Sequence, residues 1–221
     1  MTSPDVEAML INTIADGYEI DLHWITQNRE LAPERLKRIP VHFADAVASE
    51  PGVATWVRDV VARACATARA FNPRITTGPS LMLFGPVGTG KTHQAYGAIR
   101  TIALAGVALR WELITSADLF AQMRPRDRSN PEDVFERYAT TSLLVLDDLG
   151  AAKGSEWTEE VLYRLINHRY QHESPTVITT NLEPPLLREA LGDRVASRLR
   201  EMSHQVSLKG NDRRRPLRTV S

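Results

Sequence analysis

One run of eight residues, GPVGTGKT, has the composition and spacing needed to hold phosphate groups. It follows the pattern of a glycine, four residues, then glycine, lysine and serine or threonine. Glycines let the backbone turn sharply, so that N–H groups at the start of a helix surround a polyphosphate. The predicted nucleotide-binding residues are Gly85, Pro86, Val87, Gly88, Thr89, Gly90, Lys91 and Thr92.

Two residues of this loop have side-chain chemistry of their own. Lys91 would reach the β- and γ-phosphates of ATP, and the hydroxyl of Thr92 would bind Mg²⁺. A random chain of this length matches the pattern about once in a hundred, and the need for a preceding strand and a following helix lowers that rate further. The fingerprint of the alternative dinucleotide-binding fold, Gly-x-Gly-x-x-Gly, does not open this helix.

Two adjacent carboxylates end an apolar run in LLVLDDLG, residues 143 to 150. The carboxyl end of such a strand lies beside the phosphate loop, where Asp147 would hold Mg²⁺ through water. Asp148 would orient or activate the attacking water. The alternative is two solvated acids in a turn, and the phosphate loop earlier in the chain argues against it.

A polar residue also ends the run TVITTN, where the amide of Asn181 would contact the γ-phosphate or the attacking water. Thr179 and Thr180 are weaker alternatives for this contact. Asn181 would otherwise cap the turn before Pro184 and Pro185.

Arginines four residues apart in LGDRVASRLRE, Arg194 and Arg198, share one face of a predicted helix, and Arg200 points away from them. If subunits assemble head to tail, one of the two would enter the site of a neighbouring subunit and neutralise charge on the γ-phosphate, although the residues taken alone favour pairing within the helix. The alternative is an ion pair within the helix, with Asp193 or Glu201.

The elements that position these residues follow from alternating short apolar runs and longer helical periods, which are typical of an α/β fold with a parallel sheet. The predicted strands are Leu81 to Phe84, Leu109 to Ile114, Leu143 to Leu146, Thr176 to Thr180 and Gln205 to Leu208. The predicted helices are Ala54 to Ala70, Thr92 to Ala105, Ala117 to Met123, Thr158 to Gln171 and Pro185 to Met202, with Ser116 and Ser155 as caps.

Composition sets the cellular context. The chain has 221 residues, with 27 basic and 27 acidic side chains, so no overall charge attracts it to nucleic acid or membrane. No apolar run approaches the roughly 20 residues that span a bilayer, and the N-terminus does not resemble a signal peptide, so we expect a cytoplasmic protein without membrane contact. The predicted divisions are an appendage at 1–40, an ATPase domain at 41–212 and a basic tail at 213–221.

The motifs GPVGTGKT, LLVLDDLG, TTN and LGDRVASRLRE, in this order, resemble the AAA+ ATPases of the DnaC-type helicase-loader group, close relatives of IstB-type transposition ATPases. The resemblance covers about Ile39 to Arg214. It implies a P-loop NTPase core with a five-stranded parallel sheet and helices on both faces, without a C-terminal helical lid. It also implies Asn181 as the first sensor, Arg198 as the arginine finger with Arg194 beside it, and Val41 to Phe43 at the adenine.

The resemblance implies ATP and Mg²⁺ as cofactors and homo-oligomers joined through the ATP site. It further implies a replicative helicase and single-stranded DNA as partners, with the apolar face of Met9, Leu10 and Ile14 contacting the helicase. The alternative is that this face packs back on the core of the ATPase domain. Many AAA+ members have glutamate where this chain has Asp148, and the shorter side chain predicts slow turnover. The expected function is an ATPase that loads a replicative helicase. The alternatives are an IstB-type ATPase remodelling duplex DNA and a nucleotide-switched adaptor with negligible hydrolysis.

Two loops are candidates for DNA contact. MRPRDRSNP carries Arg124, Arg126 and Arg128, which would contact backbone phosphates. Ser155 and Trp157, shortly after the acidic strand, offer a hydroxyl and a ring on which a base can stack. The alternative for both is ordinary solvated loop chemistry, and for Trp157 also packing against its own helix.

Overall fold

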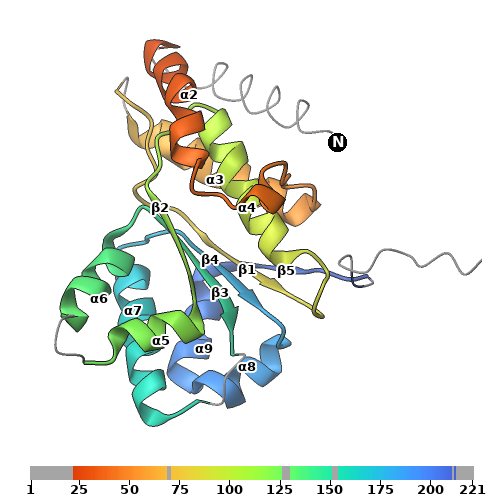
Figure 1. Cartoon of the computed structure of the whole chain (residues 1–221), viewed down its shortest axis with the longest axis vertical. Helices are drawn as coiled ribbons and strands as arrows, with labels where there is room; N and C mark the ends of the chain where they lie inside the picture. Colours follow the sequence, from red (N-terminus) through yellow and green to blue (C-terminus); the bar gives the residue numbers. More distant parts are fainter. Residues whose placement is uncertain (1–21, 69–70, 126–129, 151–153, 211, 213–221) are drawn as a thin grey trace, which may run out of the picture.

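A five-stranded, fully parallel sheet forms the centre of the protein in the computed structural model (Figure 1), which describes residues 22–68, 71–125, 130–150, 154–210 and 212. The strand order is β2-β3-β4-β1-β5. The strands are β1 (Ser80–Phe84), β2 (Trp111–Thr115), β3 (Leu143–Leu149), β4 (Thr176–Thr180) and β5 (Ser203–Ser207). All five predicted strands are confirmed.

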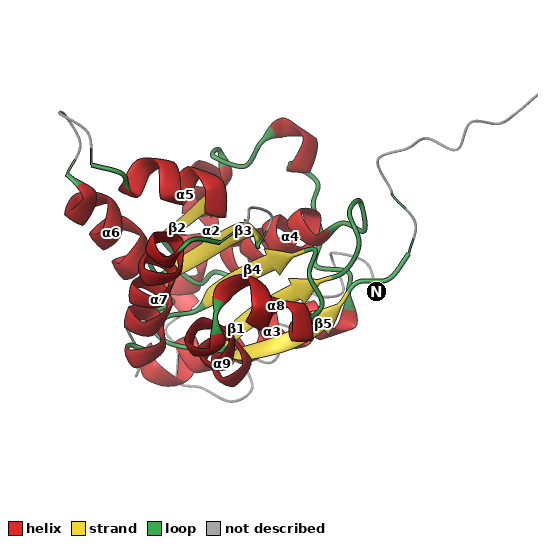
Figure 2. Cartoon of the chain, turned by 90° about the horizontal axis from the view of Figure 1, so that it is seen from below, coloured by secondary structure: helices red, strands yellow, loops and turns green. Residues whose placement is uncertain are grey.

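Helices cover both faces of this sheet (Figure 2), as predicted. One face carries α2 (Leu22–Leu36), α3 (Pro51–Ala68) and α4 (Lys91–Leu104), with the 3₁₀ helix η1 (Val41–Phe43) beside them. The other carries α5 (Ser116–Met123), α6 (Pro131–Thr140), α7 (Glu156–Gln171), α8 (Pro184–Leu191) and α9 (Asp193–Met202).

Alternate residues of the central strands enter the two cores. In β3, Leu143 and Val145 pack in the core shared with α2, α3 and α4, and Leu144 and Leu146 pack in the core shared with α5 to α9. All four side chains are fully buried, because parallel strands covered on both faces read as continuous apolar runs rather than as polar alternation. The continuous apolar run at 143–146 is therefore typical of a strand that is buried on both faces.

Four helical assignments differ from the structure. The helix α2 was not predicted. The helix α6 was not predicted, although Asn130 caps its first turn and Pro131 occupies the first helical position. The predicted single helix at 185–202 is two helices, because Gly192, with φ of 79°, ends α8. The cap of α5 is Thr115, whose hydroxyl accepts from the Asp118 N–H, and not Ser116.

The described part of the predicted appendage packs on the helices that cover one face of the sheet. In α2, Ile25 and Ala32 are buried in the core that α3 and α4 share, and Asn28 donates to the Gly106 carbonyl at 3.0 Å. Residues 22–36 therefore belong to the same packed body as the sheet. The predicted helicase-contacting residues Met9, Leu10 and Ile14 and the basic tail at 213–221 lie outside the described residues.

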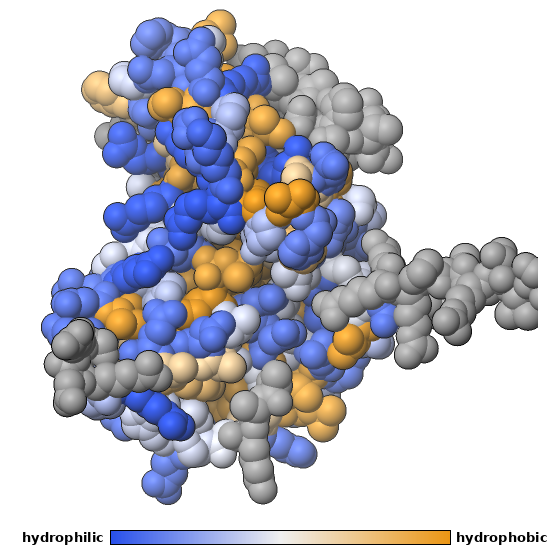
Figure 3. Space-filling view, viewed as in Figure 1, coloured by the Kyte–Doolittle hydropathy of each residue, from blue (hydrophilic) through white to orange (hydrophobic). Residues whose placement is uncertain are grey.

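The described surface mixes hydrophilic and hydrophobic side chains (Figure 3). On the face shown in Figure 3, hydrophilic side chains interrupt the hydrophobic areas. Within the described residues, no helix is both long and apolar enough to span a membrane. The residues that follow β5 in the described part of the chain, 208–210 and 212, form no helix.

Candidate nucleotide-binding site

The loop between β1 and α4 has the backbone that phosphate binding requires. Gly85, Gly88 and Gly90 have φ of 142°, 81° and 96°, values that side chains other than hydrogen rarely allow. Lys91, only 6% exposed, begins α4, and its Nζ donates to the carbonyls of Gly85 at 2.7 Å and Pro86 at 2.8 Å. The lysine charge is therefore held directly beneath the loop.

The segment after β5 runs beside this loop. A Cβ built on Gly85 would lie 2.2 Å from the Leu208 carbonyl oxygen, and one built on Gly88 would lie 2.0 Å from a carboxylate oxygen of Asp212. Glycine is thus required at both positions for space as well as for conformation. The chain beyond β5 reaches the phosphate loop itself.

The acidic residues at the end of β3 have different environments. Asp147 is 7% exposed and accepts a hydrogen bond from Thr92 Oγ1 at 3.1 Å, whereas Asp148 is exposed. Burial raises the pKa of Asp147, hydrogen bonds from Thr179 and Thr92 and the charge of Lys91 oppose this increase, and the charge of Asp148 adds to it. A cation beside Asp147 would stabilise its charged form.

An extra residue in β3 forms a bulge at the two neighbouring carboxylates. Leu146 pairs with Ile178 and Leu149 with Thr180, so three steps along β3 match two along β4. Asp148 lies in this bulge with φ of 53°, a conformation that aspartate tolerates better than most residues. The bulge directs Asp147 toward the phosphate loop and leaves Asp148 exposed.

Thr179 holds this arrangement in place, a role that the sequence did not reveal. Its hydroxyl donates to Asp147 Oδ1 and accepts from the Asp148 N–H at 3.0 Å. A threonine that ends a strand is common, and only the neighbouring strand shows what its hydroxyl contacts. Thr179 therefore fixes both carboxylates at once.

We expect Thr179→Val to lower kcat about tenfold and to leave nucleotide affinity without Mg²⁺ unchanged, because each lost hydrogen bond is worth about 1 kcal/mol. Steady-state turnover and equilibrium binding measure the two quantities. Thr180→Val is a matched control, since Thr180 is equally buried but its hydroxyl contacts Leu149 and Leu182. Equal losses of kcat in both variants would contradict the assigned role.

A cavity of about 490 Å³ joins these residues. Its described lining residues are His42, Phe43, Val87, Gly88, Gly90, Lys91, Thr92, His93, Asp148 and Asn181. The phosphate loop follows β1, the acidic pair lies at the end of β3, and Asn181 follows β4. These three strands are adjacent in the sheet, so their carboxyl ends meet at one edge.

Aromatic rings form one wall of the cavity. Phe43 stacks on Tyr96 with centroids 4.7 Å apart, and the His42 ring lies 4.1 Å from Phe43. Val41, also predicted to border adenine, is 91% exposed and is not among the described lining residues. A planar base entering the cavity would meet His42 and Phe43.

The predicted arginines lie away from this cavity, on α9. Neither Arg194 nor Arg198 is among the described residues that line it. Arg194 stacks over Tyr163 of α7 at 3.7 Å, and Arg198 stacks over Tyr170 at 4.5 Å. The predicted alternative, an ion pair within the helix, is present only as a loose contact of 3.7 Å between Arg198 and Glu201.

The structure brings together residues of the two predicted DNA-contacting loops. The Arg124 guanidinium lies 5.6 Å from the Trp157 ring centroid, and Phe120 packs edge-on against the same ring. The Ser155 hydroxyl accepts from the Thr158 N–H in a capping box, so the predicted cap is confirmed and the hydroxyl is engaged. Arg126 and Arg128 lie outside the described residues.

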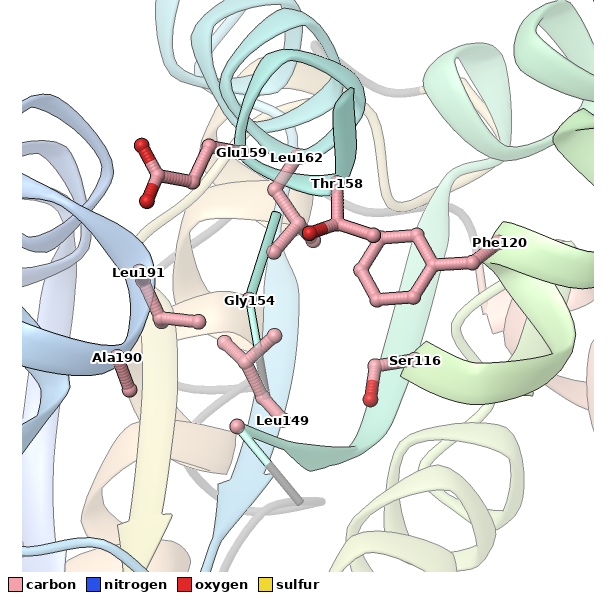
Figure 4. Close-up of a pocket in the computed structure, with 10 residues that line it drawn as sticks. Ser116, Phe120, Leu149, Gly154, Thr158, Glu159, Leu162, Ala190 and Leu191 are labelled. Carbon is pink, nitrogen blue, oxygen red and sulfur yellow. The ribbon is translucent and has the colours of Figure 1, made fainter. Parts of the chain in front are cut away.

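A smaller pocket lies between α5, α7 and α8, beside the end of β3 (Figure 4). Phe120 reaches from α5 toward Thr158 of α7, and Leu149 of β3 also lines the pocket. Ser116, which borders this pocket, is 2% exposed and donates to the Asp148 carbonyl at 2.9 Å. Ser116 thus supports the bulge instead of capping a helix.

Comparisons with known proteins identify the family of this chain. The family model described as IstB-like ATP binding protein matches residues 57–221. A putative ATP-binding protein in an insertion sequence of Mycobacterium tuberculosis is 30% identical over 159 residues, 66% of this chain and 61% of the relative. The replicative helicase loader DnaC of Escherichia coli is 27% identical over 124 residues, 55% of this chain and half of the loader.

A solved structure supports the fold. The crystal structure of the DnaC helicase loader matches with a TM-score of 0.61 at 24% identity, covering 77% of this chain and all of that chain. At this identity the match shows the fold alone. The chain spans only 61% and 50% of the two curated relatives.

Proposed function

The chain belongs to the family of IstB-like ATP-binding proteins, and on that premise we propose that it is an ATP-hydrolysing AAA+ switch that acts in DNA replication. The observation that carries this proposal is the single cavity in which Lys91, Thr92, Asp148 and Asn181 meet, with Asp147 directly behind it. These are the charges and hydrogen-bonding groups that ATP hydrolysis needs.

Each side chain has a distinct task in this site. Loop N–H groups and Lys91 bind the β- and γ-phosphates, Asp148 orients the attacking water, and Asn181 contacts the γ-phosphate. The hydroxyl of Thr92 and the carboxylate of Asp147 are hard oxygen ligands held 3.1 Å apart, which suits Mg²⁺. Bound there, Mg²⁺ supplies positive charge to the phosphates. The short side chain of Asp148 makes the reaction slow.

Hydrolysis depends on assembly. Arg194 and Arg198 lie on α9, outside their own cavity, so they reach a γ-phosphate only in a neighbouring subunit. Nucleotide between two subunits then favours the assembled state, and hydrolysis releases it. The exposure of Arg194 and the 35% exposure of the Arg198 side chain support this role.

The substrate of the assembled form is a replicative helicase being loaded on single-stranded DNA. The similarity to the loader DnaC supports this step, and Arg124 beside Trp157 offers a charge and a stacking surface to a single strand. A second candidate is a transposition ATPase acting on duplex DNA. The relative from an insertion sequence favours it.

ATP turnover and light scattering test the proposal on the natural protein, Arg198→Ala and Arg200→Ala, with single-stranded or duplex DNA. We expect single strands to stimulate turnover and assembly. Arg198→Ala should bind ATP but lose at least 90% of stimulated turnover, and Arg200→Ala, an exposed arginine of the same helix, should behave like the natural protein.

Other outcomes redirect the assignment. Stimulation by duplex DNA alone would favour the transposition ATPase. A protein that binds ATP but stays monomeric and ignores DNA would rule out trans-acting hydrolysis and leave a nucleotide-switched adaptor.

The DNA contact has its own test. We expect Trp157→Ala to weaken binding of a fluorescent single-stranded oligonucleotide about tenfold through lost stacking. Arg124→Ala should weaken binding and reduce its salt dependence by about one phosphate contact. Arg58→Ala, on α3 in the opposite helical layer, is the control. Unchanged binding by both variants would place the DNA elsewhere.

A further inference from the structure

The helices α7 and α9, on the face of the sheet that carries α5 to α9, present matching rows of side chains to each other. Tyr163, Asn167 and Tyr170 lie at i, i+4 and i+7 of α7, which places them on one face. Their partners Arg194, Arg198 and Glu201 have the same spacing on α9. The two helices pack together, so the two rows meet along their length.

Each arginine in this row is held by an aromatic ring. The Arg194 guanidinium carbon lies 3.7 Å from the Tyr163 centroid, and that of Arg198 lies 4.5 Å from the Tyr170 centroid. Asn167 Oδ1 accepts from Arg198 Nε at 3.4 Å, and the Tyr170 hydroxyl donates to Glu201 at 2.5 Å. Both tyrosines are half-buried, which fixes the rings in place.

Stacking on an aromatic ring restricts the rotamers of an arginine side chain but does not use its N–H groups as hydrogen-bond donors. A guanidinium lying over a ring keeps its N–H groups in its own plane, directed away from the ring. A free arginine side chain loses about 2 kcal/mol of rotamer freedom when it is fixed. An arginine already held over a ring has lost much of that freedom before a phosphate arrives, so binding the phosphate costs less.

We propose that Tyr163 and Tyr170 are positioning residues that pre-orient Arg194 and Arg198 for the γ-phosphate of a neighbouring subunit. This inference rests on the proposed function. The burial of a neighbouring face of α9 supports it, because Val195 and Leu199 are 2% and 1% exposed and anchor the helix in the core. With the backbone anchored, the rings decide where the guanidinium groups lie.

The test uses mixed assemblies in which one subunit supplies the arginines and another supplies the ATP site. Lys91→Ala subunits lack a working site but still offer arginines. Subunits with Arg194→Ala and Arg198→Ala keep the site but offer none. Each alone should hydrolyse ATP poorly, and the mixture with single-stranded DNA should regain turnover.

The tyrosine variants are then introduced into the Lys91→Ala subunit. We expect Tyr163→Leu to lower the kcat of the mixture about tenfold, with the KM for ATP unchanged because the ATP site belongs to the other subunit. Tyr163→Phe should restore turnover, since it keeps the ring. Tyr170→Leu and Tyr170→Phe should differ in the same way. Turnover is normalised to the amount of mixed assembly measured by light scattering.

The outcomes separate the inference from its premise. If the parent mixture regains no turnover, the arginines do not act in trans and the proposed function fails. If the parent mixture is active and the Tyr163→Leu and Tyr170→Leu mixtures are equally active per assembly, the function stands and the positioning role is wrong.

Discussion

Lys91→Ala is expected to weaken ATP binding at least a hundredfold and to remove measurable turnover. The lysine is almost fully buried at the start of α4, and its ammonium group lies against the carbonyls of Gly85 and Pro86, where the phosphates enter. Alanine leaves the N–H groups of the loop in place but removes the Lys91 ammonium group at the start of α4.

Two measurements check this result. Titration with a fluorescent ATP analogue gives the change in Kd, and the melting temperature in excess ATP should rise for the natural protein but not for Lys91→Ala. Lys37→Ala, on the surface beside Glu34, is the matched control. An equal ATP-dependent rise in melting temperature for both variants would show that the nucleotide does not depend on Lys91.

Arg169→Met is expected to destabilise the fold by about 4 kcal/mol, because several buried acceptors lose their donor together. Arg169 is fully buried in α7, and its guanidinium donates to the Thr176 hydroxyl and to four backbone carbonyls. These carbonyls belong to Tyr138, Ala139, Thr141 and Pro175.

The position of this arginine explains the size of the effect. Hydrogen bonds from the Arg169 guanidinium link the end of α6 to the segments that lead into β3 and β4. Burial lowers the pKa of Arg169 to about 9, so the side chain still carries its charge at neutral pH. The cation favours the carbonyls at the carboxyl end of a helix, which carry partial negative charge.

Urea denaturation with a constant m-value measures the loss. Arg164→Met, on the same helix, removes an exposed pair with Glu132 and should change stability little. A loss from Arg169→Met no greater than that from Arg164→Met would show that the buried carbonyls find other donors, and the assigned structural role would be wrong.

Local patterns explain why much of the fold could be predicted. Each predicted strand was a short apolar run, and the phosphate loop was a contiguous pattern whose function depends on its own backbone. The missed helix α6 and the missed break between α8 and α9 also had local signals, Asn130 with Pro131 at the start of α6 and Gly192 at the end of α8. Both errors arose because capping and turn residues that are present in the sequence were not interpreted as helix ends.

The sequence by itself therefore determined the parallel α/β fold, the phosphate loop and the acidic end of β3, because neighbouring residues specify strand period, glycine turns and helix starts. Only the tertiary structure decided that Thr179 fixes Asp147 and Asp148, that Arg124 meets Trp157, and that Tyr163 and Tyr170 hold Arg194 and Arg198. These contacts join residues about 30 positions apart in the chain. Side-chain chemistry makes such pairs favourable, but the packing of strands and helices chooses which of them meet.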